Sequence, residues 1–131
     1  MGRYDRVRER TGWVPPAGET VQRRAAITVL LAMSYDSDPL TRRVAAKNLC
    51  PCHLRANHAS AWERLIKLAH DADAGVRADA VHALADGSPS VLRARIVEVF
   101  EALYNDPDPR VRKQVRRVLT GYRRTGNLNV L

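Results

Sequence analysis

The strongest constraint on the fold of this chain is a short segment that occurs three times at a fixed spacing of 35 residues. The copies begin at Asp36, Asp71 and Asp106, and they read DSDPLTRRVAAKNL, DADAGVRADAVHAL and DPDPRVRKQVRRVL without a gap. A period in this range predicts an array of supersecondary units that bury their apolar faces by stacking on one another. Four columns are identical in all copies: Asp36/Asp71/Asp106, Asp38/Asp73/Asp108, Arg42/Arg77/Arg112 and Leu49/Leu84/Leu119.

Each unit is predicted to be a helix, an acidic turn and a second helix. An apolar segment of helical period precedes each copy; the three are TVQRRAAITVLLAMSY, SAWERLIKLAH and SPSVLRARIVEVFEALY. The D-x-D-P turns at 36–39 and 106–109 place Asp at a helix cap and Pro at the first helical position. Gly121 is predicted to end the last helix. No strand pattern competes, so we expect an all-α fold. The buried stripe expected on the last helix is Val111, Val115, Val118 and Leu119.

This layout resembles the HEAT repeat family, including its short bacterial variants, over about residues 20–120. The motif that carries the resemblance is D-x-D-P-x-V-R-x-x-A-x-x-A-L, with Thr41 in place of its Val and Ala74 in place of its Pro. The resemblance implies an α-solenoid of three HEAT-like repeats whose second helices line the concave side. It also implies that each turn Asp and the Arg six positions later form a ladder of hydrogen bonds between successive repeats.

The resemblance also suggests how the chain is divided. We expect an N-terminal arm or cap at 1–19, repeats at about 20–52, 53–87 and 88–122 within 20–124, and a tail at 125–131. In the arm, Trp13 and Val14 are expected to pack over the first repeat, unless the arm becomes ordered only on a partner. The apolar end of the tail either folds back on the last repeat or contacts a partner or a second copy. Its apolar residues are Leu128, Val130 and Leu131.

Length and composition indicate one domain that functions inside the cell. A chain of 131 residues is long enough to bury a core, and a content of only 5% aromatic residues suits close-packed helices better than a β-sandwich. No apolar run approaches the roughly 18 residues of a membrane span. The charged N-terminus lacks the apolar stretch of a signal peptide. Two cysteines do not make a secreted disulfide scaffold. We therefore expect a cytoplasmic protein without membrane contact.

The positive charge is concentrated at the C-terminal end. Residues 110–131 contain seven Lys or Arg and no Asp or Glu, so they account for nearly all of the net charge of +8. Like charges crowded on one helix repel each other, and the helix dipole offsets only part of this cost. An anionic partner would offset the rest. The binding candidates are Lys113, Arg116, Arg117, Arg123 and Arg124, with Arg43 and Lys47 as a possible extension that Asp79 would interrupt.

Nucleic acid, alone or within a ribonucleoprotein, is the partner that this charge favours. The planar guanidinium of Arg donates two parallel hydrogen bonds to a phosphate. Tyr122 either stacks on an unpaired base or packs against the last helical turn. An acidic protein is the alternative partner, because HEAT-like modules commonly act as scaffolds. A solvated surface without a specific partner remains a third interpretation.

The sequence gives no reason to expect catalysis, a cofactor or a bound metal. The segment CPCHLRANH gathers Cys50, Cys52, His53 and His58, but their spacing differs from the paired ligands of a structural zinc site. Cys50 also falls in a column with Ala85 and Thr120, which suits a small buried residue. His70 and His82 are expected to be surface or packing residues, and no catalytic motif is present. Some DNA glycosylases are built from HEAT-like repeats, but they need about twice as many repeats as the three expected here, so we do not expect that activity. We therefore expect a non-catalytic binding module.

Overall fold

The computed structural model describes residues 2–14, 20–50 and 58–128, and every regular element in these ranges is helical. The expected all-α class is therefore confirmed for this part of the chain. No helix within it is both long and apolar enough to span a membrane. The elements are α1 (Arg3–Thr11), α2 (Thr20–Met33), α3 (Pro39–Asn48), α5 (Ala59–Leu68), α6 (Ala74–Leu84), the 3₁₀ helix η1 (Ser90–Leu92), α7 (Arg93–Ala102) and α8 (Pro109–Thr125).

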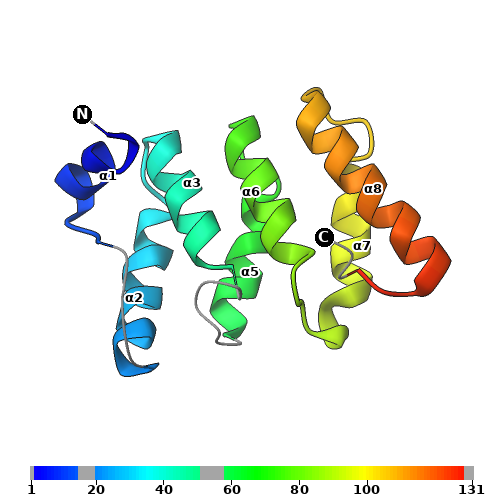
Figure 1. Ribbon diagram of the computed structural model, residues 1–131, viewed down its shortest axis with the longest axis horizontal. Coiled ribbons are helices and arrows are strands. Elements are labelled where there is room, and N and C mark those ends of the chain that lie inside the picture. Colours follow the sequence, from blue (N-terminus) through cyan, green and yellow to red (C-terminus); the bar gives the residue numbers. More distant parts are fainter. Residues whose placement is uncertain (1, 15–19, 51–57, 129–131) are drawn as a thin grey trace.

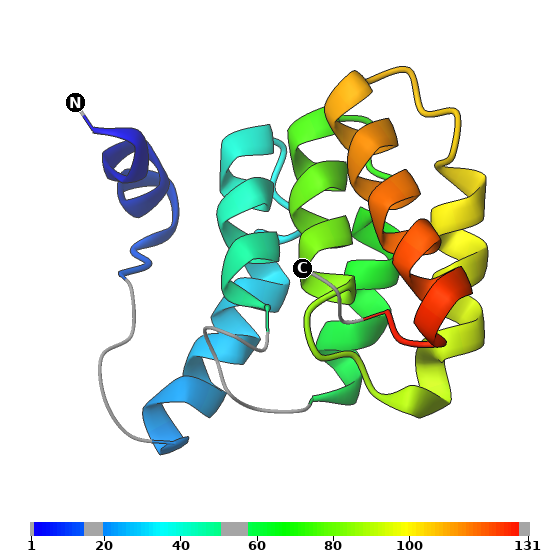
Figure 2. The same ribbon diagram turned by 45° about the vertical axis from the view of Figure 1, so that its right-hand side comes forward.

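The helices form two layers of neighbouring elements. Helices α3, α6 and α8 lie side by side in one layer, with α6 in contact with both α3 and α8 (Figure 1). Helices α2, α5 and α7 form the other layer, and α2 packs on α3, α5 on α6 and α7 on α8 (Figure 2). Helix α1 contacts α3 at the N-terminal end of the array. Each 35-residue unit therefore contributes one helix to each layer.

The acidic turns are held by the aspartates that the sequence repeats. The first Asp of each turn accepts a hydrogen bond from the backbone N–H of the second Asp: Asp36 from Asp38 (2.8 Å), Asp71 from Asp73 (2.8 Å) and Asp106 from Asp108 (2.9 Å). Asp73 caps α6 by accepting from the Val76 N–H, and Asp108 caps α8 by accepting from the Arg110 and Val111 N–H groups. Asp38 instead accepts from the Thr41 hydroxyl. The bonds at Asp73 and Asp108 satisfy backbone donors that a helix start leaves unpaired, whereas Asp38 makes no such side-chain bond to α3.

Ion pairs link successive units, and they confirm the expected ladder of hydrogen bonds. Arg42 donates through Nε and Nη2 to both carboxylate oxygens of Asp71, at 2.9 and 3.0 Å. Arg77 binds Asp106 in the same bidentate way, at 2.9 Å for both bonds. Burial alone would raise the pKa of Asp106, but the hydrogen bonds from Arg77 and from the Asp108 N–H, with the charge of Arg77, hold it below its ordinary value.

The two ends of the ladder differ. At the N-terminal end, Arg10 of α1 binds Asp36 (2.5 Å) and Arg6 binds Asp38 (3.0 Å), so α1 supplies cations where a preceding unit would. At the C-terminal end, Arg112 donates through Nη1 to the backbone carbonyl of Asp106. Within the described ranges, no carboxylate binds the other side of the Arg112 guanidinium. Of the three repeated arginines, only Arg42 and Arg77 therefore bind a carboxylate of the next unit within the described ranges.

Small aliphatic side chains build most of the core, as the composition suggested. The predicted stripe on α8 is confirmed, because Val111, Val115, Val118 and Leu119 are all at most 1% exposed. Phe100 of α7 is fully buried and is the largest such side chain. In the N-terminal arm, Val7 and Trp13 are buried, but Val14 is 57% exposed, so the expectation that Val14 packs was wrong.

The prediction that Gly121 ends the last helix was wrong. Helix α8 continues through Gly121 to Thr125, and Gly126 ends it with φ of 73°. The Gly126 N–H donates to the Tyr122 carbonyl oxygen at 2.7 Å. Leu128, just beyond this turn, is 2% exposed and Tyr122 packs against the core. This burial offsets the roughly 1 kcal/mol that a glycine costs inside a helix. Val130 and Leu131 lie outside the described residues.

Gly126→Ala is expected to destabilise the protein by about 1 kcal/mol, because an L side chain is strained at a positive φ. The matched control is Gly126→Asn, since asparagine tolerates this conformation better and should cost less. Urea unfolding of the two variants measures the difference. Equal stability of the Ala variant and the parent chain would show that α8 does not end at this residue.

Candidate functional site

Helix α8 presents three cations on one exposed face. Lys113, Arg117 and Arg124 are exposed, and none has a hydrogen bond or ion pair with any residue in the described ranges. At 100° per residue they fall within an arc of about 40°, opposite the buried stripe. The helical rise separates them along the axis by about 6 Å and about 10 Å. We call Lys113, Arg117 and Arg124 the basic face.

Arg117 and Arg124 of the basic face line a shallow depression. An open hollow of about 380 Å³ is lined by Arg116, Arg117, Thr120, Gly121 and Arg124. Gly121 has no side chain, so the groove between the arginines is not filled. Because α8 extends beyond Gly121, Arg124 lies on the same helix face as Arg117 and does not lie on a tail. The length of the helix therefore decides whether these cations can act together.

Arg116 is exposed, but one edge of its guanidinium is already in use. Its Nε donates to the Tyr104 carbonyl oxygen at 2.9 Å, and its Nη2 donates to Asn105 Oδ1 at 2.8 Å. The guanidinium also lies over the Tyr104 ring, 4.3 Å from its centroid. Arg116 therefore holds the turn between α7 and α8. It can add charge to the site, but the Nε/Nη2 edge of its guanidinium is occupied and cannot contact a ligand.

Arg123 and Tyr122 differ from their neighbours in orientation. Arg123 is exposed, and the helical angle places it about 100° away from Arg124 and beside Arg116, at the edge of the basic face. Tyr122 packs against the core, which settles the choice between stacking on a base and packing in favour of packing. The site can therefore contact a ligand through charge and hydrogen bonds, without this aromatic ring.

Of the two cations in the expected extension onto α3, Arg43 is paired with an acid. Arg43 donates to Asp79 of α6 at 3.0 Å, and its side chain lies against Gly75, where an added Cβ would be 2.8 Å from it. The sequence suggested only that Asp79 would interrupt a basic track. In the structure Asp79 also neutralises the charge of Arg43. Lys47 is half-buried and lines a narrow crevice with Tyr4 of α1. Of the two α3 candidates, only Lys47 is therefore without an ion pair within the described residues.

Few acids lie near the basic face. Arg110, at the start of α8, pairs with Asp108 at 3.2 Å, and this pairing holds the pKa of Asp108 below its ordinary value. After Asp108 the chain contains no Asp or Glu. The charge of Lys113, Arg117, Arg123 and Arg124 is therefore uncompensated within the described residues.

The candidate metal ligands are distributed differently from the sequence expectation. Cys50 lies with His82 and Asp86, while His58 is half-buried at the start of α5, and Cys52 and His53 lie outside the described residues. His82 is a surface residue, as expected, and Asp86 is the acid beside it. His82 and Asp86 are four residues apart, a spacing that places them on one helix face and could have revealed the pair.

The chain was also compared with known proteins. Neither the protein-family models, nor the curated proteins, nor the solved structures gave a match.

Proposed function

We propose that this chain is an α-solenoid of three HEAT-like repeats that binds nucleic acid, alone or within a ribonucleoprotein, through the basic face of α8. The observation that carries the proposal is that Lys113, Arg117 and Arg124 are exposed on one helix face without partners among the described residues. The repeated turns, the two helical layers and the bonds from Arg42 and Arg77 support the repeat architecture. No residue has a catalytic role in this proposal.

The charge arrangement favours a ligand with regularly spaced phosphates. Three cations spaced over about 16 Å of helix match a polyanion better than a single small anion. Neutralising them relieves their mutual repulsion and releases counterions from the nucleic acid. Because Tyr122 packs against the core, the contact uses the phosphate backbone and does not read unpaired bases by stacking. We therefore expect binding that depends weakly on base sequence.

An acidic protein is the alternative partner, because the same cations would pair with carboxylates. A carboxylate surface lacks the condensed counterions of a nucleic acid, so the dependence of affinity on salt separates the two partners. The binding experiment therefore measures affinity across a range of salt concentrations.

The test measures the anisotropy of fluorescent RNA and DNA, single-stranded and duplex, after nucleic acid has been stripped from the full chain at high salt. In Lys113→Ser/Arg117→Ser/Arg124→Ser we expect at least a tenfold loss of affinity. The slope of log K against log salt should fall by about 2 to 3, since each phosphate contact contributes about 0.9.

The matched control removes three exposed cations elsewhere, with the substitutions Arg8→Ser, Lys67→Ser and Arg93→Ser. The control has the same net charge, so an effect of overall charge would weaken both variants equally. If the control variant binds nucleic acid as tightly as the parent chain while the α8 variant binds more weakly, the contact lies on α8. Equal binding by the parent chain and the α8 variant would exclude the basic face as the nucleic-acid site and leave the acidic protein as the partner to seek.

A further inference from the structure

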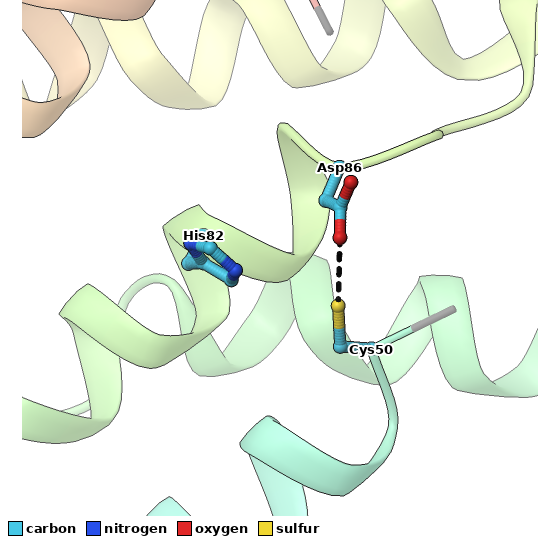
Figure 3. A group of neighbouring side chains, drawn as sticks. All are labelled: Cys50, His82 and Asp86. Atoms are coloured by element: carbon cyan, nitrogen blue, oxygen red, sulfur yellow. Dashed lines mark hydrogen bonds between the residues drawn. The ribbon is translucent and has the colours of Figure 1, made fainter. Parts of the chain in front are cut away.

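A thiol, an imidazole and a carboxylate meet where the first unit packs against the second. The ligand atoms of Cys50, His82 and Asp86 all lie within 4.8 Å of one another (Figure 3). The Cys50 thiol donates a hydrogen bond to Asp86 Oδ2 at 3.4 Å. Cys50 follows the end of α3, whereas His82 belongs to the last turn of α6 and Asp86 follows that helix. Two elements that are distant in the sequence thus bring three potential metal ligands together.

The burial of the three groups forms a gradient from the core to solvent. Cys50 is 1% exposed, Asp86 is half-buried and His82 is exposed. The imidazole therefore lies on the solvent side of the cluster and the sulfur on the core side. The exposed His82 ring can also change rotamer without disturbing the core. Such a cluster differs from an isolated buried cysteine, because two further ligand types face the sulfur from the neighbouring helix.

Stacking of the repeats does not require these three residue types. The residues 35 positions later occupy the corresponding place between the second and third units, and they are Ala85, Arg117 and Gly121. That second junction contains neither a thiol nor a carboxylate in these columns, yet α6 and α8 pack there as well. A small residue in the Cys50 column would satisfy packing, so the helical array does not explain why Cys, His and Asp occur together at the first junction.

We propose that Cys50, His82 and Asp86 bind a divalent cation of the zinc class. Thiolate, imidazole and carboxylate are the ligand types that Zn²⁺ accepts, and a thiolate argues against Mg²⁺ and Ca²⁺. The charges also balance, because the thiolate and the carboxylate together neutralise the two charges of the cation. Binding displaces the thiol proton that now bonds to Asp86, and that proton passes to solvent.

The geometry needs only a local adjustment. Tetrahedral Zn²⁺, with bonds of about 2.0–2.3 Å, places its ligand atoms about 3.5 Å apart. The separation of 3.4 Å between Cys50 Sγ and Asp86 Oδ2 already meets this requirement. The ligand atom of His82 lies within 4.8 Å of the other two, and this exposed ring must move closer to them to complete the site. Three protein ligands leave a fourth position for water or another donor, and the cation would join the C-terminal ends of α3 and α6.

The test titrates the metal-free full chain with Co²⁺ and Zn²⁺. Binding of Co²⁺ by a thiolate gives a sulfur-to-cobalt charge-transfer band, and Zn²⁺ should remove that band by competition. We expect one Co²⁺ per chain and at least a tenfold loss of affinity in His82→Ala and Asp86→Asn, which remove ligands outside the core. Saturating Zn²⁺ should raise the Tm of the parent chain and leave that of His82→Ala nearly unchanged.

Three control variants keep the proposal open to refutation. Cys50→Ala, which introduces the residue of the second unit, should fold and lose the band. Cys52→Ser and His70→Ala should keep both the band and the affinity. No charge-transfer band in the parent chain would overturn the proposal. A band that survives in His82→Ala but disappears in Cys52→Ser would also overturn it, because the ligands would then lie elsewhere.

Discussion

Arg77→Ala is expected to lower the free energy of unfolding by about 3–5 kcal/mol. Asp106, whose side chain is only 4% exposed, accepts both of its bidentate bonds from Arg77. Without the guanidinium this carboxylate stays buried with a single backbone N–H as its donor. An uncompensated buried charge costs more than the ion pair itself contributes. Urea unfolding followed by circular dichroism measures the loss.

Arg112→Ala is the matched control for this variant. Arg112 occupies the same column and makes the same pair of bonds to its own turn, through Nη1 to the carbonyl oxygens of Asp106 and Pro107. It has no carboxylate from a further unit within the described ranges, so its loss should cost about 1 kcal/mol or less. If the two variants were equally destabilised, the bond between units would contribute nothing, and the bonds within the turn would account for the whole effect.

The pH dependence of Arg77→Ala follows from the lowered pKa of Asp106 in the folded chain. A carboxylate with a lowered folded pKa stabilises the fold fully above its unfolded pKa of about 3.9, and the contribution is lost as pH falls through the folded pKa. In Arg77→Ala, burial without the cation instead raises the pKa of Asp106. Acidification then neutralises the buried charge. The difference in free energy of unfolding between the parent chain and Arg77→Ala should therefore become smaller from pH 7 to pH 3.

Phe100→Ala is expected to cost about 3–5 kcal/mol, because it removes the largest fully buried side chain and leaves a cavity in a close-packed core. Phe100 lies on α7, which packs on α8 and so supports the helix that carries the basic face. The free energy of unfolding in urea gives the size of the loss. Nucleic-acid affinity, measured where the variant remains folded, should change little.

Val91→Ala provides the comparison for Phe100→Ala. Val91 lies just before α7 and is 85% exposed, so its truncation should change stability by about 0.5 kcal/mol or less. A loss at Phe100 as small as that at Val91 would mean that the α7–α8 pair is loosely packed. The assignment of Phe100 to the core would then be incorrect.

Much of the local structure could be read from the sequence, because short-range interactions decide it. The repeated aspartates marked the turns, and their bonds to N–H groups two or three residues away depend on neighbouring residues alone. The apolar spacing on the last helix likewise identified its buried stripe. The end of α8 was misjudged at Gly121, because the burial of Tyr122 and Leu128 is a tertiary interaction that carries the helix past a residue of low helical propensity.

For the candidate site, too, some properties follow from the sequence and others only from the tertiary structure. The sequence by itself determined that the C-terminal end is basic, since that follows from composition. Only the tertiary structure decided which cations remain available, because long side chains pair with groups that packing brings near them. Packing engages Arg116 at the Asn105 turn and Arg43 at Asp79, and it places Cys50 beside Asp86, 36 residues away. Local sequence patterns define helices and turns, whereas contacts between stacked units determine the chemistry of the surface.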